Sequence, residues 1–336
     1  MTSLRPTEIK EEARARLAQA PQRAKILQIY CGILLVLCVI FTGGSYLLDG
    51  MMANAGGLGA IGKRTMIQTF QRLLPFLNIF SMMVLELGMW NAMLRISRGQ
   101  YASPQSLKMG LSRFFPWFRF QLLQVLGLIA IGFVLMYVAM AVFFMTPFAK
   151  AALELTMPLA MEYTDPLVIA EMMMADETLL MSMYEALIPM YIIMAVLMIL
   201  AWVPISYRLR VANLIILDDP TAGAFRALLR SFRQTKICWK WYVRLDLSFW
   251  WYYVLLVLST ALSYLDILMA AVGRPLPMDA TAASLLSYGL YLVVHLAICY
   301  FLQPKVQVST AILYDALLPP KKDPTNGVVL GNIFHM

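Results

Sequence analysis

Two ionisable residues stand inside long apolar stretches of the sequence. Glu86 lies nine residues before Arg95, and His295 lies ten residues before Lys305. If both stretches are membrane-spanning helices that end at these cations, the two side chains lie at a similar depth in the bilayer. A carboxylate at that depth costs about 2.5–3.5 kcal/mol or more unless it is protonated, paired or hydrated. Glu86 and His295 are therefore the first candidates for chemistry.

Three interpretations of these residues are open. Glu86 and His295 can be a proton-coupling pair in a transporter, because an ionisable pair in a low dielectric can exchange a proton. They can also form an interhelical hydrogen bond worth about 0.6–2 kcal/mol that only holds the helices together, which is the interpretation we favour. Alternatively, Glu86 stays protonated and packs, because burial disfavours its charged form. Asn78 and Asn91 share the stretch with Glu86 and complete the set of intramembrane polar candidates.

Motifs of soluble enzymes are absent from the sequence. There is no P-loop, no dinucleotide-binding glycine motif, no HExxH and no GxSxG. Only two histidines occur, which excludes a histidine-rich metal site, and the cysteines lack CxxC spacing and read as small packing residues. The cysteines are Cys31, Cys38, Cys238 and Cys299. We therefore expect no metal site, no cofactor and no enzymatic activity.

The polar candidates depend on six long apolar stretches. The chain is 61% hydrophobic and 14% charged, whereas a soluble domain has about 45–50% apolar and about 25% charged residues. A membrane-spanning helix needs about 20 mostly apolar residues. The predicted spans are residues 26–48, 73–96, 122–145, 187–207, 247–269 and 285–302. The sequence thus predicts an all-α fold, a polytopic six-helix transmembrane bundle over residues 26–318, followed by a flexible cytoplasmic tail, 319–336.

The cations are sorted by side. Nearly all of the 27 Lys and Arg residues lie before the first span, after the sixth, or in the second and fourth connections. The exceptions are Lys63, Arg64, Arg72, Lys150 and Arg274. The positive-inside rule then places both termini in the cytoplasm. Orientation and anionic lipid headgroups account for the net charge of +8, so we expect the bilayer and other membrane proteins as partners and no nucleic acid.

The N-terminal residues 1–25 have the pattern of a cytoplasmic amphipathic helix. Thr7 can cap it, and Ile9, Ala13 and Leu17 line one face. We expect this helix to lie at the membrane interface.

Similar patterns precede the third span, at Ser103-Pro104, and the fifth, at Asp219-Pro220. The apolar stripe of the latter is Phe225, Leu228, Leu229 and Phe232, and its basic, lipid-facing stripe is Arg226, Arg230 and Arg233. At the start of the fifth span, Asp246 is expected to form a local ion pair with Arg244 or Lys240. The order of amphipathic helix and two spans would then occur three times, either as a true repeat or because any hairpin protein with basic inner loops has this pattern.

Residues 207–317 carry short motifs in a recognisable order. They are Tyr207, Asp218, Pro220, Ser231, Ser248-Phe249, Pro304 and Tyr314. In these residues the chain resembles a family of uncharacterised bacterial integral membrane proteins, domain of unknown function 975. A glycine usual in the basic segment is missing, and Lys305 replaces a usual tyrosine. The resemblance implies a multi-helix protein of the bacterial inner membrane and supplies no catalytic residue.

Two classes of function remain open. A transport-related protein or permease accessory component predicts a polar, water-accessible cavity around Glu86, Asn91 and His295. A non-catalytic membrane scaffold or envelope-stress factor predicts a filled bundle whose contacts run through the basic inner helices. We lean towards the transport-related interpretation.

Overall fold

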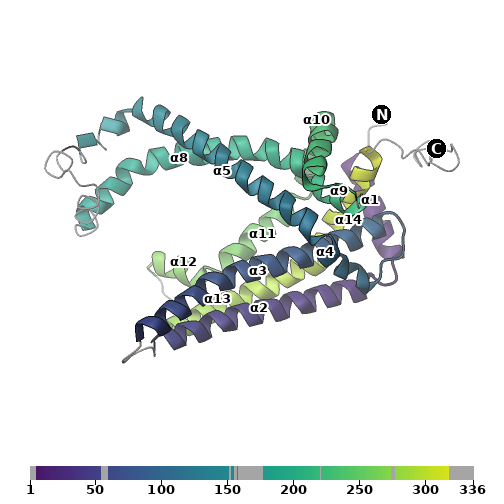
Figure 1. Ribbon diagram of the computed structural model, residues 1–336, viewed down its shortest axis with the longest axis horizontal. Coiled ribbons are helices and arrows are strands. Elements are labelled where there is room, and N and C mark those ends of the chain that lie inside the picture. The colour runs from purple at the N-terminus through teal and green to yellow at the C-terminus, as the bar shows by residue number, and fades with distance from the viewer. Residues whose placement is uncertain are drawn as a thin grey trace. The chain divides into compact units, whose positions relative to one another are not determined.

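The structure, a computed structural model, describes residues 5–53, 60–150, 153, 154, 157, 177–219, 221–273 and 277–317 (Figure 1). Every regular element in these ranges is helical, so the predicted all-α fold is confirmed there. The predicted tail, 319–336, lies outside the described residues. The chain divides into two compact units: unit 1 comprises residues Met1–Trp117 and Arg210–Met336, and unit 2 comprises residues Phe118–Leu209.

Unit 1 contains most of the helices. They are α1 (Pro6–Gln19), α2 (Arg23–Ala53), α3 (Ala60–Ser97), the 3-10 helix η1 (Pro104–Lys108), α4 (Met109–Ser112), α9 (Ala212–Asp218), α10 (Ala224–Ser248), α11 (Trp250–Leu262), α12 (Leu265–Ala271), α13 (Ala280–Phe301) and α14 (Gln303–Leu317). Helix α2 packs along α3 and α13, and α13 packs along α11 (Figure 1).

Unit 2 contains most of α5 (Phe114–Phe144) and all of α8 (Glu177–Leu209). Few of their side chains are buried within the protein, and the apolar ones are mostly exposed. A small apolar contact forms where Phe143 and Ala149 meet Leu187 and Met190. Such helices are suited to hydrocarbon, where an exposed apolar surface carries no penalty.

Five described helices are long and apolar enough to cross a membrane, and a bent pair would make a sixth. Helices α2, α3, α5, α8 and α13 contain the predicted spans 26–48, 73–96, 122–145, 187–207 and 285–302 to within a residue at their ends. By their length and composition these helices are suited to a membrane.

The fifth predicted span, 247–269, is not one helix. The last part of α10 meets α11 at 64°, and a second break separates α11 from α12. At both breaks a serine hydroxyl bonds a carbonyl one turn earlier, Ser248 to Leu245 at 2.5 Å and Ser263 to Thr260 at 2.7 Å. Such local bonds compete with the helical ladder, and hydropathy does not detect them.

The bend at Phe249 is held by the N-terminal helix. The ammonium group of Lys10 donates to the carbonyl oxygen of Ser248, and it lies over the Phe249 ring at 4.3 Å from the centroid. The bend removes the Ser248 carbonyl from the helical hydrogen-bond pattern, and the Lys10 ammonium group supplies a charged donor in its place.

Helix α1 is shorter than the predicted 1–25, and it begins at Pro6 after the cap residue Arg5 rather than at Thr7. Its predicted face of Ile9, Ala13 and Leu17 is fully buried, but against protein. The helix packs mainly on α14, and also on α3 and α10. The interfacial placement is therefore wrong for this face, because sequence periodicity cannot tell whether lipid or another helix covers it.

The segment after Ser103-Pro104 is a 3-10 turn followed by a single α-turn, η1 and α4, packed on α3. A Cβ atom added to Gly88 would overlap the Leu107 carbonyl, and one added to Gly110 would overlap the Val84 carbonyl. The two glycines therefore permit this close approach. The segments that precede the first, third and fifth spans thus differ in structure.

Helix α14 is the most enclosed element of unit 1. All its residues from Gln303 to Tyr314 are buried except Lys305. It contacts α1, α3, α10 and α13. We call α14 together with α1, α9, α10 and the C-terminal half of α3 the α14 cluster.

Candidate functional site

Glu86 differs from its neighbours on α3. Leu85, Leu87 and Met89 are buried, whereas the Glu86 side chain is exposed. Trp90, one turn later, donates its indole N–H to the Glu86 Oε1 atom at 3.4 Å. This long, exposed bond leaves most of the acceptor capacity of the carboxylate unused.

Three other helices bring polar groups towards this carboxylate. The hydroxyl groups of Tyr30 on α2 and Tyr252 on α11, and the thiol of Cys299 on α13, lie within electrostatic range of Glu86. Tyr30 is buried, and the Gln303 side chain at the start of α14 interacts with its hydroxyl. Side chains from four helices thus lie within electrostatic range of one exposed carboxylate.

The structure does not bring Glu86 and His295 together. No hydrogen bond or ion pair joins them within the described part of the chain, and the buried Nδ1 atom of His295 has no partner there. His295 stacks on Tyr291 at a centroid distance of 5.2 Å. The residue of α13 near Glu86 is Cys299, one helical turn from His295. The expected contact between Glu86 and His295 is therefore not present among the described residues.

The two asparagines have different roles. Asn91 is buried, and its amide donates to the Ser106 carbonyl at 3.0 Å, so it fixes η1 against α3. The Oδ1 atom of Asn78 is buried, and it has no partner among the described residues. Asn91 is thus engaged in the packing of η1 on α3, and no described contact brings it to His295.

A charged network at the end of α3 was not predicted. The Arg98 guanidinium donates to Asp315 on α14 at 2.7 and 3.0 Å and to Asp218 on α9 at 2.6 Å. Burial disfavours the charged guanidinium, but its bonds to Asp315 and Asp218 outweigh that cost and raise the pKa of Arg98 above its usual value. One cation therefore ties together three helices.

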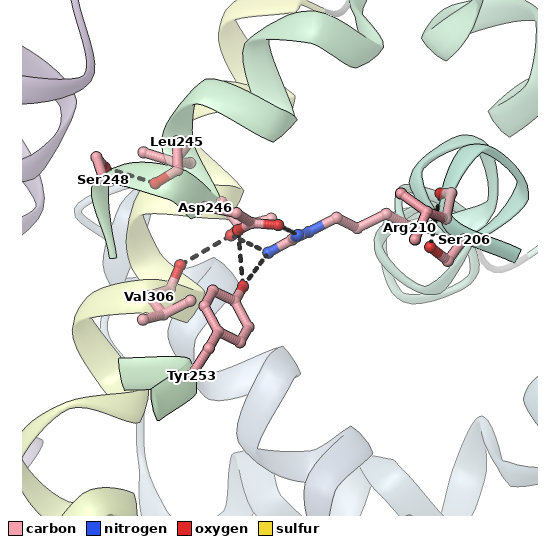
Figure 2. A network of polar contacts seen from close by, with 9 residues as sticks. Ser206, Arg210, Leu245, Asp246, Ser248, Tyr253 and Val306 are labelled. Atoms are coloured by element: carbon pink, nitrogen blue, oxygen red, sulfur yellow. Dashed lines mark hydrogen bonds and ion pairs between the residues drawn. The ribbon is translucent and has the colours of Figure 1, made fainter. Parts of the chain in front are cut away.

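A second network surrounds Asp246 (Figure 2). Arg210 forms an ion pair with Asp246, whose side chain is almost fully buried, and the Tyr253 hydroxyl donates to the same carboxylate at 2.8 Å. Figure 2 shows the Arg210 side chain extending towards Asp246 and Tyr253 from another segment of the chain. The local ion pair expected with Arg244 or Lys240 is therefore wrong. Both are exposed, whereas Asp246 lies on the buried face of α10.

The predicted basic stripe of α10 is exposed. Arg226, Arg230 and Arg233 are all exposed, and the prediction that they face lipid stays a prediction. Arg230 also forms an ion pair with Asp219 at 2.7 Å, which the sequence had not indicated. Hydrogen bonds from Thr221 and Arg230 lower the pKa of Asp219 from 3.8 to about 2.

Asp219 does not start α10 as predicted. It ends α9 as its cap residue, and the residue that caps α10 is Gly223. The Asp219 carboxylate instead accepts bonds from the backbone and hydroxyl of Thr221 in the turn between the helices.

Searches against family models, curated proteins and solved structures found no match to this chain. The resemblance to domain of unknown function 975 stays a prediction from its motif residues.

Proposed function

We propose that this chain is a multi-pass protein of the bacterial inner membrane that takes part in proton-linked transport, with Glu86 as the group that binds and releases the proton. The observation that carries the proposal is the exposed Glu86 carboxylate within the apolar length of α3, without an ion pair in the described part of the chain.

The energetics support a functional reason for this residue. An intramembrane carboxylate costs about 2.5–3.5 kcal/mol or more, and this cost is usually removed by a paired cation. Here Trp90 donates one long hydrogen bond at 3.4 Å, and the hydroxyl groups of Tyr30 and Tyr252 lie within electrostatic range of the carboxylate without bonding to it among the described residues. No paired cation in the described ranges fixes the carboxyl group in its charged form, which leaves it free to serve as the proton-binding group.

The orientation in this proposal places both termini and the α14 cluster on the cytoplasmic side. Its support is the accumulation of Lys and Arg in the segments that flank this end of the helices. Glu86 then lies on the cytoplasmic side of the bilayer centre.

The test is proton flux in proteoliposomes. The purified protein is reconstituted with a pH-sensitive dye inside the vesicles, and a membrane potential drives protons inward. We expect flux with the natural chain and none with Glu86→Gln, which keeps the size of the side chain and removes the titration. Asp49→Asn is the matched control, because Asp49 accepts a bond from Gln71 at 2.7 Å near the other end of α2. Equal flux for all three proteins, or none with the natural chain, contradicts the proposal.

A second candidate is a non-catalytic membrane scaffold. The Arg98 and Arg210 networks favour it, since they hold the α14 cluster rigid rather than lining a path for solute. A scaffold predicts no proton flux, and it predicts that Glu86→Gln changes nothing but stability.

A further inference from the structure

Helix α10 has three faces, and two of them are open. Its buried face carries small or polar residues that pack on α9 and α14, among them Ala227, Ser231, Thr235 and Tyr242. Four large apolar residues of α10 are instead exposed. They form an apolar stripe of Phe225, Leu229, Trp239 and Leu247, which are 64%, 41%, 36% and 67% exposed.

A basic stripe runs beside the apolar stripe. Its members are Arg226, Arg230, Arg233, Lys240 and Arg244, and all are exposed. Arg226, Arg233 and Lys240 make no ion pair within the described residues, whereas Arg230 pairs with Asp219 and Arg244 lies near the Trp241 ring. An exposed apolar stripe flanked by unpaired cations is the pattern of a helix that lies in a lipid headgroup layer.

The bend at Phe249 supports the same placement. The last part of α10 makes an angle of 64° with α11, the helix that continues the predicted fifth span. If α11 crosses the bilayer, α10 cannot continue along that path and runs much closer to the membrane plane. The stacked Trp250 and Trp251 at the bend, with centroids 3.7 Å apart, are the residues expected at the boundary between hydrocarbon and headgroups.

We propose that α10 is an interfacial helix that binds anionic phospholipid, with its apolar stripe in the outer part of the hydrocarbon layer and its basic stripe on the lipid phosphates. Charge complementarity selects the lipid class, since the stripe offers only cations to its occupant. Lysine and arginine stems reach from an apolar surface to the headgroups, so both stripes are satisfied in one orientation. This inference does not depend on the role of Glu86.

The experiment uses a fluorescent label on Leu229→Cys in the purified full-length chain, reconstituted in vesicles. The native cysteines are buried or half-buried, and wild-type chain treated in the same way gives the background signal. A nitroxide group is carried close to the headgroup, either by phosphatidylglycerol or by phosphatidylcholine at equal mole fraction. We expect both lipids to quench the label, and phosphatidylglycerol to quench it severalfold more strongly, with a preference that added salt weakens.

Two comparisons make the result specific. In R226Q/R233Q/K240Q the preference for phosphatidylglycerol at Leu229→Cys should disappear, whereas R5Q/R14Q/K25Q removes the same charge elsewhere and should keep it. A label on Phe76→Cys, an exposed position of α3, should show no preference between the lipids.

The proposal is overturned if neither lipid quenches the Leu229→Cys label, which would mean that water or protein covers the stripe. It is also overturned if the preference is absent from the natural chain or survives in the R226Q/R233Q/K240Q variant.

Discussion

The two halves of α3 have similar apolar character and opposite surroundings. From Met66 to Phe80 its large apolar side chains are mostly exposed, with Phe76 at 71%. From Leu85 to Ile96 they are buried, with Leu87 at 1%. The second half packs on η1 and α4, where Asn91 donates to the Ser106 carbonyl and Gly88 lies against Leu107.

Hydropathy therefore shows that a segment tolerates an apolar environment, but it does not show whether that environment is lipid or a protein interior. Lipid and a protein interior are equally acceptable to a leucine. Ionic side chains help to separate the two cases, since Arg98, which follows the buried half directly, ties it to Asp218 and Asp315. We therefore expect substitutions in the α14 cluster to destabilise the protein, and equivalent ones in the exposed half to have little effect.

The largest effect is expected from Arg98→Met. The substitution leaves Asp218 and Asp315 close together without their cation, and breaking a buried pair in this way costs about 3–5 kcal/mol. Because the Arg98 side chain is 26% exposed, the lower end of that range applies. Thermal unfolding of the purified protein in detergent should show a clearly lowered midpoint.

Arg98→Lys is the control for geometry. Lysine keeps the charge but cannot make the two-pronged bond to Asp315, so a smaller loss is expected. The comparison between the two ends of α3 fails if Arg98→Met unfolds at the same temperature as a charge-removing change at Arg72, which lies near the start of the predicted second span.

The all-α fold and the spans in α2, α3, α5, α8 and α13 follow from hydropathy, because long apolar runs in a backbone that must satisfy its own hydrogen bonds leave few alternatives. The enclosure of α14 does not follow from it. Its residues Gln303, Gln307 and Thr310 give it a polar composition that suggests an exposed helix, but they are buried. Which helices surround it is set by contacts between distant parts of the chain, such as Arg98 with Asp315.

The candidate site was predictable in part. Glu86 stands out in any reading, because a carboxylate is rare inside an apolar run. Its neighbours Tyr30 and Cys299 could not be found, since tyrosine and cysteine are ordinary residues in membrane helices and only packing brings them together. Arg210 and Asp246 each stand at the end of an apolar run, which marks them as candidates for ion pairs. Nothing in the sequence indicates that they pair with each other.

The next effect concerns the contact between α3 and η1. Gly88→Ala places a methyl group against the Leu107 carbonyl, so the backbone of η1 has to move. Overpacking of this kind typically costs about 1–3 kcal/mol. The matched change is Gly43→Ala in α2, where an added Cβ atom meets nothing within 4 Å. Its unfolding midpoint should stay the same or rise slightly, and equal losses for both variants would contradict the structure.

A smaller effect is expected from Lys10→Met at the bend between α10 and α11. The variant loses the charged donor to the Ser248 carbonyl and the contact with the Phe249 ring, and such a hydrogen bond contributes about 1.5–3 kcal/mol when both groups are buried. Lys10 is only half-buried, so a loss of about 1 kcal/mol is the better expectation. Lys25→Met, at an exposed position, should leave the unfolding midpoint unchanged.

The smallest effect is a pH dependence at the turn that leads into α10. Bonds from Thr221 and Arg230 lower the pKa of Asp219 from 3.8 to about 2, so the folded state favours the charged carboxylate more than the unfolded chain does. The resulting stability is present above the usual pKa and is lost as the pH falls towards 2. Because Arg230 is exposed, it amounts to less than about 1 kcal/mol. Asp219→Asn should therefore lower the unfolding midpoint slightly near neutral pH, and the difference from the natural chain should vanish in acid. A difference that persists at the lowest pH would show that Asp219 stabilises the turn without its charge. The ion pair with Arg230 would then contribute nothing, and Arg230 would be as available to lipid phosphate as Arg226 and Arg233.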